Sequence, residues 1–153
     1  MKSRPTPLPH CSGSTLGLLF RQIRDGMWAR MELELAESGH DLTFSQYVTI
    51  KKLADGTASV TDLARAAELN PGAMTRLLDR LEARGLLVRV ADPSDRRALH
   101  IHLTDDGRRI WRDIDQCGQR VRMVALDGFS DAETEQFTAL LERVRDNLST
   151  PET

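Results

Sequence analysis

The sequence has few cysteines and no long apolar run, and both absences restrict where the protein can work. Its two cysteines, Cys11 and Cys117, lie too far apart to form a disulfide framework or a CxxC motif, so we expect reduced thiols. The longest early apolar run, residues 16–20, is too short for a signal-peptide core or a membrane-spanning helix. These absences predict a cytoplasmic protein that does not contact a membrane.

Motifs of catalysis are missing as well. The chain has no nucleophile elbow, no glycine-rich loop for phosphate and no HExxH sequence. Its four histidines show no arrangement that would pair a base with an orienting acid. The sequence therefore predicts that the protein is not an enzyme and that it holds no cofactor.

The chain also lacks a strong excess of either charge, because its formal net charge is −2 over 153 residues. An argument for nucleic-acid binding must therefore depend on where the charges lie. Between Arg76 and Arg97 six arginines accompany four acidic residues, which gives this segment a net charge of +2. The bias is modest, and taken alone it would also fit a solvated face.

Helical periodicity dominates both ends of the chain beyond an irregular arm predicted for residues 1–13. A long helix is predicted over residues 14–38, with apolar side chains at intervals of three and four: Leu16, Phe20, Ile23, Met27, Met31 and Leu35. Residues 105–148 predict two more helices, the first with a heptad-like stripe of Ile110, Ile114, Cys117, Val121 and Val124. Such stripes must be buried, and a symmetric helical interface in a homodimer is the simplest place. The alternative is a monomeric helical bundle.

The middle of the chain, residues 44–104, combines short helices with a β-hairpin. Thr43, Ser59 and the pair Asn70-Pro71 are typical of helix starts. Two alternating segments follow, residues 86–90 and 99–103, and we expect Leu86, Val88 and Val90 on the buried face of the first. This order predicts a winged helix-turn-helix within a mainly α fold with a small β-hairpin, flanked by N- and C-terminal dimerisation helices.

The second helix of a winged helix-turn-helix enters the major groove of DNA with its N-terminal end. Here its apolar stripe leaves Pro71, Gly72, Thr75, Arg76, Asp79 and Arg80 facing outward. The candidate DNA-binding residues in and before this helix are Ser59, Asn70, Pro71, Gly72, Ala73, Thr75, Arg76 and Arg80.

Two adjacent arginines, Arg96 and Arg97, stand at the predicted hairpin tip, where turn formation needs only the preceding Asp92-Pro93-Ser94-Asp95. A tip beside a helix seated in the major groove reaches the neighbouring minor groove, whose negative potential attracts arginine. Asp95 would repel phosphate if it were free, so we expect it to pair with an arginine and to orient it. A solvated loop with incidental arginines is the alternative interpretation.

The run NPGAMTRLLDRLEARGLLVRVADPSDRRALHIHLTDDG resembles the core of the MarR family of transcription regulators. It includes a wing signature of Asp, any residue, Arg, then Leu-Thr and Gly, which falls here on Asp95, Arg97, Leu103-Thr104 and Gly107. The resemblance extends over residues 15–148. It implies a single MarR-like domain over residues 14–148, with the winged unit at 44–104 and the dimerisation helices at 14–38 and 105–148.

Roles for individual residues follow from that resemblance. Thr75 and Arg76 match recognition-helix contacts, Arg97 matches the wing arginine of the minor groove, and Asp95 matches its orienting partner. Arg80 and Arg96 are assigned to phosphate by position only. The resemblance implies an intertwined homodimer that binds a pseudo-palindromic operator in double-stranded DNA.

Many relatives release DNA when a small aromatic acid or a similar compound fills a crevice between the dimerisation helices and the winged unit. The sequence supplies candidates for such an effector site, each of which could instead be ordinary core or surface: Arg21, Trp28, His40, Tyr47 and Trp111. The predicted function is thus a sequence-specific transcription regulator, a repressor that a small, aromatic ligand releases from its operator.

Other functions stay open at this point. His100 and His102 share one face of a strand and could bind metal with His10, Cys11 or Cys117, although phosphate contact explains them equally. Cys11 could sense oxidants, but its neighbours lack apolar and tyrosine residues, and Cys117 falls on an apolar stripe and is expected in the core. A protein-interaction adapter with a winged unit and a nucleoid-type architectural binder are the remaining alternatives.

Overall fold

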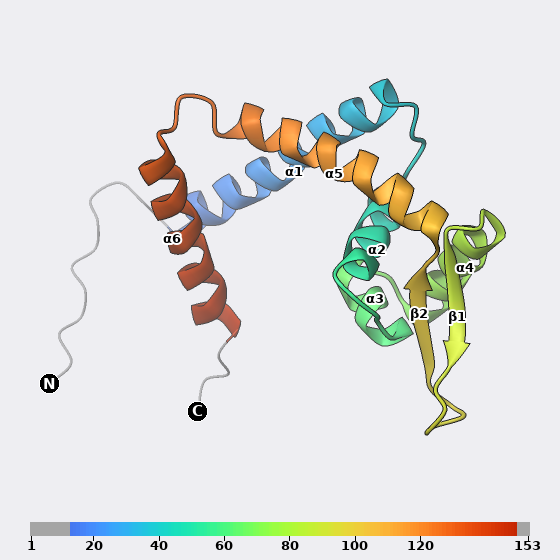
Figure 1. Ribbon diagram of the computed structural model, residues 1–153. Helices are drawn as coiled ribbons and strands as arrows, with labels where there is room; N and C mark the ends of the chain where they lie inside the picture. The colour runs from blue at the N-terminus through green and yellow to red at the C-terminus, as the bar shows by residue number, and fades with distance from the viewer. Residues whose placement is uncertain (1–12, 150–153) are drawn as a thin grey trace, which may run out of the picture.

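The computed structural model describes residues 13–149. Over this range six helices and two strands follow one another: α1 (Gly13–Glu37), α2 (Phe44–Ala54), α3 (Val60–Ala66), α4 (Pro71–Ala83), β1 (Leu87–Ala91), β2 (Leu99–Leu103), α5 (Asp105–Ala125) and α6 (Asp131–Ser149). Helices α1 and α5 cross each other, with the winged unit at one end and α6 at the other (Figure 1). The predicted arm lies outside the described residues except Gly13, which begins α1. No helix in the described range is long and apolar enough to cross a bilayer.

Capping side chains begin the helices where the sequence predicts them. The Thr43 hydroxyl accepts from the Gln46 amide at 3.2 Å, while the Gln46 side chain accepts from the Thr43 amide at 3.1 Å. Ser59 and Thr104 begin α3 and α5 in the same way, each accepting from an amide three residues on. Each such bond satisfies a donor that would otherwise be unpaired at the helix end, which is worth about 1 kcal/mol.

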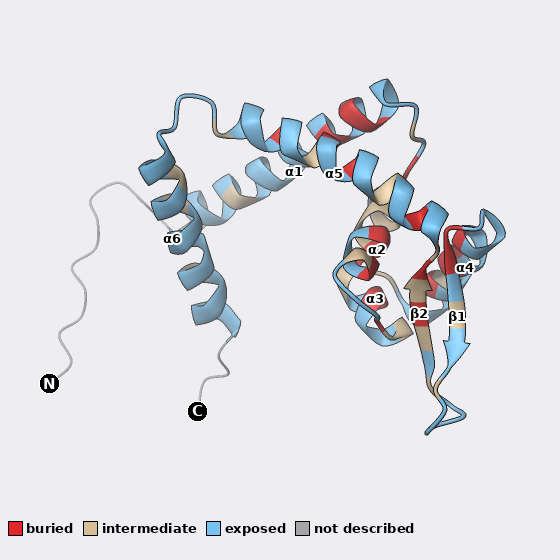
Figure 2. Cartoon of the chain, in the orientation of Figure 1, coloured by how far each residue is buried: buried red, intermediate tan, exposed pale blue. Residues whose placement is uncertain are grey.

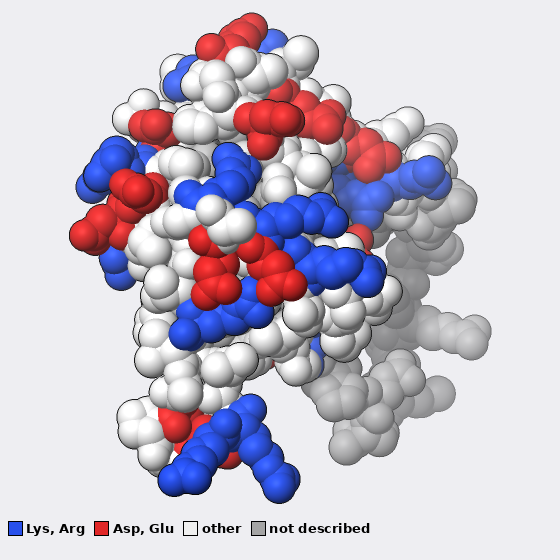
Figure 3. Space-filling view, turned by 90° about the vertical axis from the view of Figure 1, so that its right-hand side faces the viewer, with Lys and Arg blue, Asp and Glu red and all other residues white. Residues whose placement is uncertain are grey.

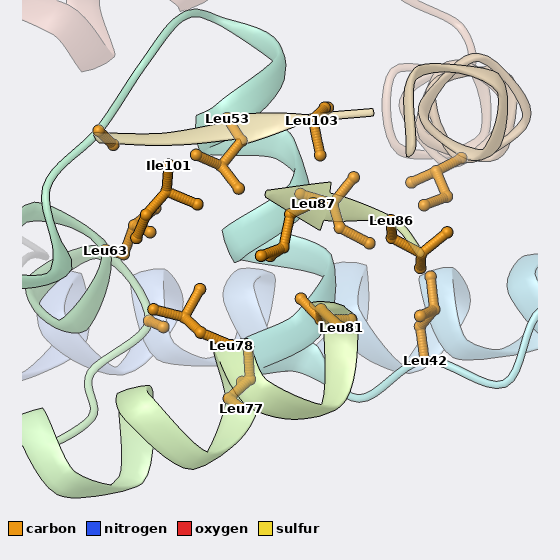
Figure 4. Close-up of a cluster of buried hydrophobic side chains, with 14 of the residues drawn as sticks. Leu42, Leu53, Leu63, Leu77, Leu78, Leu81, Leu86, Leu87, Ile101 and Leu103 are labelled. Atoms are coloured by element: carbon orange, nitrogen blue, oxygen red, sulfur yellow. The ribbon is translucent and has the colours of Figure 1, made fainter. Parts of the chain in front are cut away.

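The main core lies inside the winged unit, where leucine side chains from α2, α3, α4 and both strands converge (Figure 4). Leu63, Leu78, Leu81 and Ile101 are fully buried. This core fixes the face of α4 that points inward, and so it also decides which α4 residues are left for a ligand. The same core includes Ile114 and so extends into α5.

The hairpin is antiparallel, and Leu87 pairs with Leu103. The predicted phase of its first strand is wrong, because Leu87 is buried whereas Val88 and Val90 are 42% and 48% exposed. The physical reason lies at the end of α4, where the Leu86 amide donates to the Leu81 carbonyl at 3.0 Å. Leu86 thus closes the helix, and the alternation of the strand begins one residue later.

The second strand is buried only where it lies over the core. Ile101 and Leu103 point inward as predicted, but Leu99 is 43% exposed because it lies toward the hairpin tip, beyond the core. Gly107, in the first turn of α5, is packed against the end of α4. A Cβ atom there would lie 2.0 Å from the Leu86 carbonyl oxygen, so only glycine allows this close approach.

The long helices carry apolar side chains that a single chain does not cover. Met31 and Leu35 of α1 are buried, but Leu16, Ile23 and Met27, on the same predicted stripe, are 44–49% exposed. Helix α6 has no buried residue at all within its described length. Figure 2 shows this contrast between the winged unit and the outlying helices.

Candidate nucleic-acid interface

Helix α4 presents its N-terminal end to solvent, with Asn70 and Thr75 as the polar side chains there. The Asn70 carboxamide oxygen accepts from the Ala73 amide at 2.8 Å, and Pro71 occupies the first turn, where no amide donor is needed. Thr75 is exposed, and its hydroxyl donates to the Pro71 carbonyl at 2.9 Å. Of the predicted contacts in this part of the chain, Pro71, Gly72, Thr75, Arg76, Arg80 and Asn70 are exposed, whereas Ala73 and Ser59 are half-buried.

Two of the predicted contacts have a structural role in the free protein. Asn70 caps α4, and the Ser59 hydroxyl caps α3 by accepting from the Asp62 amide at 3.2 Å. The turn between these helices contains Glu68 with a φ of 55°, a left-handed conformation that lets the chain reverse over a few residues. The local sequence therefore sets the angle at which α4 leaves α3.

The arginines of α4 and of the hairpin tip have no acidic partner. Across the described residues, no carboxylate lies within 4.0 Å of the side chains of Arg76, Arg80, Arg84, Arg96 or Arg97. Most arginines of the long helices, in contrast, make ion pairs, as Arg109 does with Asp106 at 2.9 Å. Unpaired guanidinium groups are free to bind phosphate oxygens without first breaking a protein contact.

Arg89 of β1 fastens the hairpin to α4, a contact that sequence reasoning missed. Its guanidinium binds Asp79 and, at 3.1 Å, Glu82, both on α4. Asp79 faces outward, as helical periodicity indicates, but it is paired with Arg89. Arg89 is only 20% exposed, and its Nε is buried without an acceptor. Arg89 offsets one of the two negative charges of Asp79 and Glu82, and these contacts hold the hairpin against α4.

The base of the hairpin loop is organised by Asp92. Its carboxylate accepts from the Ser94 amide and hydroxyl at 2.8 and 2.7 Å, and it pairs with His100 Nε2 at 2.8 Å. These bonds, chiefly the one from the Ser94 hydroxyl and then that with His100, hold the pKa of Asp92 well below its usual range. The Asp92 amide donates to the Ala98 carbonyl at 3.0 Å, which closes the loop.

Asp95 has a different contact from the expected one. Its carboxylate accepts from the backbone amide of Arg97 at 2.9 Å, and no ion pair joins it to either tip guanidinium in the described structure. A backbone donor two residues ahead is closer to a short turn side chain than an extended guanidinium is. Asp95 thus shapes the turn, and both tip arginines extend freely, as the basic tip at the bottom of Figure 3 shows.

The histidines of β2 do not converge with other metal-binding side chains. His100 is engaged by Asp92, and no group of three or more His, Cys, Asp or Glu residues within residues 13–149 could hold a metal ion. Cys117, a third predicted ligand, is buried against Arg120, and His10 and Cys11 lie outside the described residues.

Comparisons with known proteins agree with this geometry. A model of the MarR family matches residues 42–99. The relative described as uncharacterized HTH-type transcriptional regulator YybA of Bacillus subtilis (strain 168) is 27% identical over 109 residues, which cover 71% of this chain and 73% of YybA. The structure of a MarR family protein from Bacillus stearothermophilus is 28% identical with a TM-score of 0.76, covering 90% of this chain and 95% of its own. The winged unit therefore resembles the MarR family in sequence, and the described chain resembles a MarR-family structure in fold.

A second solved structure to which the chain is similar is that of a protein regulated by a small molecule. BpsR of Bordetella bronchiseptica, whose DNA binding is regulated by 6-hydroxynicotinic acid, is 27% identical with a TM-score of 0.71, covering 86% of this chain and 98% of its own. The MarR family, whose model matches residues 42–99 of this chain, consists of transcription regulators.

The chain has an aromatic crevice between α1, α2 and α5. Three predicted effector-site residues, Trp28, Tyr47 and Trp111, line its volume of about 540 Å³. The rings of Trp28 and Tyr47 lie 5.8 Å apart between centroids, and burial raises the pKa of Tyr47. Charged side chains of both signs also line it, namely Arg24, Lys51, Arg122, Asp55 and Asp115.

The two other predicted effector residues lie away from that crevice. Arg21 is exposed and pairs with Asp25 at 3.7 Å, one turn along α1. His40 Nε2 lies 3.5 Å from Asp113 of α5. The sequence could not separate these residues from the lining, because the crossing of α1 over α5 decides which side chains meet there.

An ionic cluster around the buried Glu34 joins α1 to α5. Glu34 accepts from Arg120 Nε at 2.6 Å and from Arg30 at 3.0 Å, and these bonds, chiefly the first, lower the pKa of Glu34. Cys117 is fully buried, as predicted, with its Sγ 3.2 Å from Arg120 and 3.3 Å from the Ser38 hydroxyl. The cluster fixes the crossing of the two helices from which the winged unit extends.

Proposed function

We propose that this chain, which resembles the MarR family, is a transcription regulator that binds a pseudo-palindromic operator as a homodimer, represses transcription there, and is released by a small aromatic ligand. The observation that carries the proposal is the set of unpaired arginines on α4 and the wing, next to an exposed helix N-terminus. In this proposal Thr75 and Arg76 read base edges, together with the exposed first turn of α4. Arg80 and Arg96 bind phosphate, and Arg97 enters the minor groove.

The half-exposed apolar stripe of α1 and the uncovered α6 support the dimeric part of the proposal. A second copy of the chain would cover these faces by the same residues, as a two-fold interface requires. Such a pair would place two α4 helices about 34–36 Å apart, which is one turn of DNA. Half-sites of the operator should then be spaced by one turn.

The aromatic crevice supports the effector part. A planar acid of the size that regulates BpsR fits a pocket of this class, with aromatic walls and a few cationic groups in its lining. The crevice lies between α5 and α2, so an occupant would touch both a long helix and the winged unit. Its binding can be measured by the quenching of Trp28 and Trp111 fluorescence.

The proposal is tested by selecting duplexes from fragments of the source genome and measuring their affinity over a range of salt concentrations. Each phosphate contact contributes a slope of about −0.9 in log K against log salt, so several unpaired arginines predict a steep loss of affinity. Footprinting of the selected duplex should show one protected pseudo-palindrome. Weak binding at every salt concentration would contradict the proposal and favour a protein partner.

A further inference from the structure

A second hollow lies beside the aromatic crevice, and Trp111 lines both. Its volume is about 390 Å³. Three parts of the chain meet there: the end of α2 with the loop that follows, the end of β2, and the first turns of α5. The lining residues that carry polar groups or a ring are Thr57, His102, Arg108, Trp111 and Arg112.

The lining of this hollow contains cationic groups and no acid. Arg108 and Arg112 are one turn apart on α5, so they lie on the same face of the helix, where like charges repel. Arg112 has no carboxylate within 4.0 Å in the described range. Arg108 contacts Asp105 at 3.3 Å, but Asp105 is 97% exposed, so this contact holds the guanidinium only weakly.

His102 adds an imidazole to the lining of this hollow. It is half-buried, and its imidazole makes no hydrogen bond to any described residue. Thr57 also lines the hollow, from the loop whose Ala58 carbonyl accepts from the Ile101 amide at 3.3 Å. The aromatic crevice differs in chemistry, because Asp55 and Asp115 are part of its lining.

We propose that this hollow binds the phosphate group of a small molecule. A phosphate carries up to two negative charges and three acceptor oxygens, which match two guanidinium groups, an imidazole and a hydroxyl. An anion placed there would also relieve the repulsion between Arg108 and Arg112. The bound molecule would join α5 to β2 and to the loop after α2, which are parts of the long-helix scaffold and of the winged unit.

The test needs no DNA, so it is independent of the proposed operator binding. Inorganic phosphate and phosphoglycolate are titrated into the 15N-labelled full chain at constant ionic strength, and the amide and indole resonances are followed. We expect saturable shifts centred on Thr57, His102 and the Trp111 indole. Arg112→Gln and Arg108→Gln should each weaken binding at least tenfold.

Matched variants separate this site from its neighbours. Arg109→Gln removes an adjacent arginine of α5 that pairs with Asp106, and Arg122→Gln removes one from the aromatic crevice, so both should bind as the unaltered chain does. Tighter binding of phosphoglycolate would identify a phosphorylated organic molecule as the ligand, and equal affinities would identify free phosphate. Unchanged affinity in Arg112→Gln, shifts that do not saturate, or shifts confined to α4 and the wing tip would overturn the proposal.

Discussion

At the scale of the residue, the account depends on guanidinium groups that the protein leaves unpaired. Arg97→Ala should weaken binding to the selected duplex by about 1–3 kcal/mol, because no other side chain replaces a positioned arginine at the groove. Arg143→Ala, on α6, removes an exposed arginine that also lacks an ion pair in the described structure, and it should bind DNA normally. Fluorescence anisotropy measures the DNA affinity of both variants. Equal losses of affinity would show that Arg97 contributes only a nonspecific charge.

Glu34 gives a prediction for stability. Its pKa in the folded protein is lowered by the bond from Arg120, so Glu34 stabilises the fold at pH values above its ordinary pKa. That contribution is lost as the pH falls through the lowered pKa. In urea unfolding between about pH 7 and about pH 3, the free energy of unfolding of the unaltered chain should therefore fall more steeply than that of Glu34→Gln. Glu32→Gln, an exposed neighbour, serves as control, and parallel curves for Glu34→Gln and the unaltered chain would contradict this role.

At the scale of the element, Arg89 sets how the wing and α4 sit together. Arg89→Asp should weaken DNA binding, because it frees the hairpin and leaves Asp79 and Glu82 near phosphate without a counter-charge. Combining it with Asp79→Arg should restore part of the affinity, with a coupling energy on the order of 1 kcal/mol. The same exchange at Arg109 and Asp106 is the control. Thermal unfolding shows whether each variant folds. If the double variant folds but does not recover DNA affinity, the contact between Arg89 and Asp79 does not position the hairpin.

The elements also show what the sequence could predict. Helix starts were predictable from Thr43, Ser59 and Asn70, because a cap is a contact between near neighbours in the chain. The phase of β1 could not be predicted in this way, because Leu86 and Leu87 are adjacent apolar residues. Only the packing of Leu86 at the end of α4 decides which of them begins the strand. Arg89 with Asp79 and Arg120 with Glu34 join separate elements, so no local pattern identifies them.

At the scale of the whole molecule, the uncovered apolar faces predict assembly. Ile23→Glu places a charge on the exposed stripe of α1 and should dissociate the homodimer, with a loss of operator affinity because two half-sites are no longer bound together. Gln22→Glu adds the same charge one residue away from the stripe and should leave the dimer intact. Sedimentation velocity distinguishes the two, and a monomeric unaltered chain would refute the proposed assembly.

The most direct test of the central claim is hydroxyl-radical footprinting of the selected duplex, which reports on protection within the minor groove. With the unaltered chain, the account predicts two protected minor-groove tracts placed symmetrically about the centre of the operator. With Arg97→Ala, at a concentration that restores occupancy, these tracts should be lost while guanine protection in the major groove remains. Minor-groove protection that is identical in both proteins would contradict a wing arginine in the groove and, with it, the proposed mode of DNA binding.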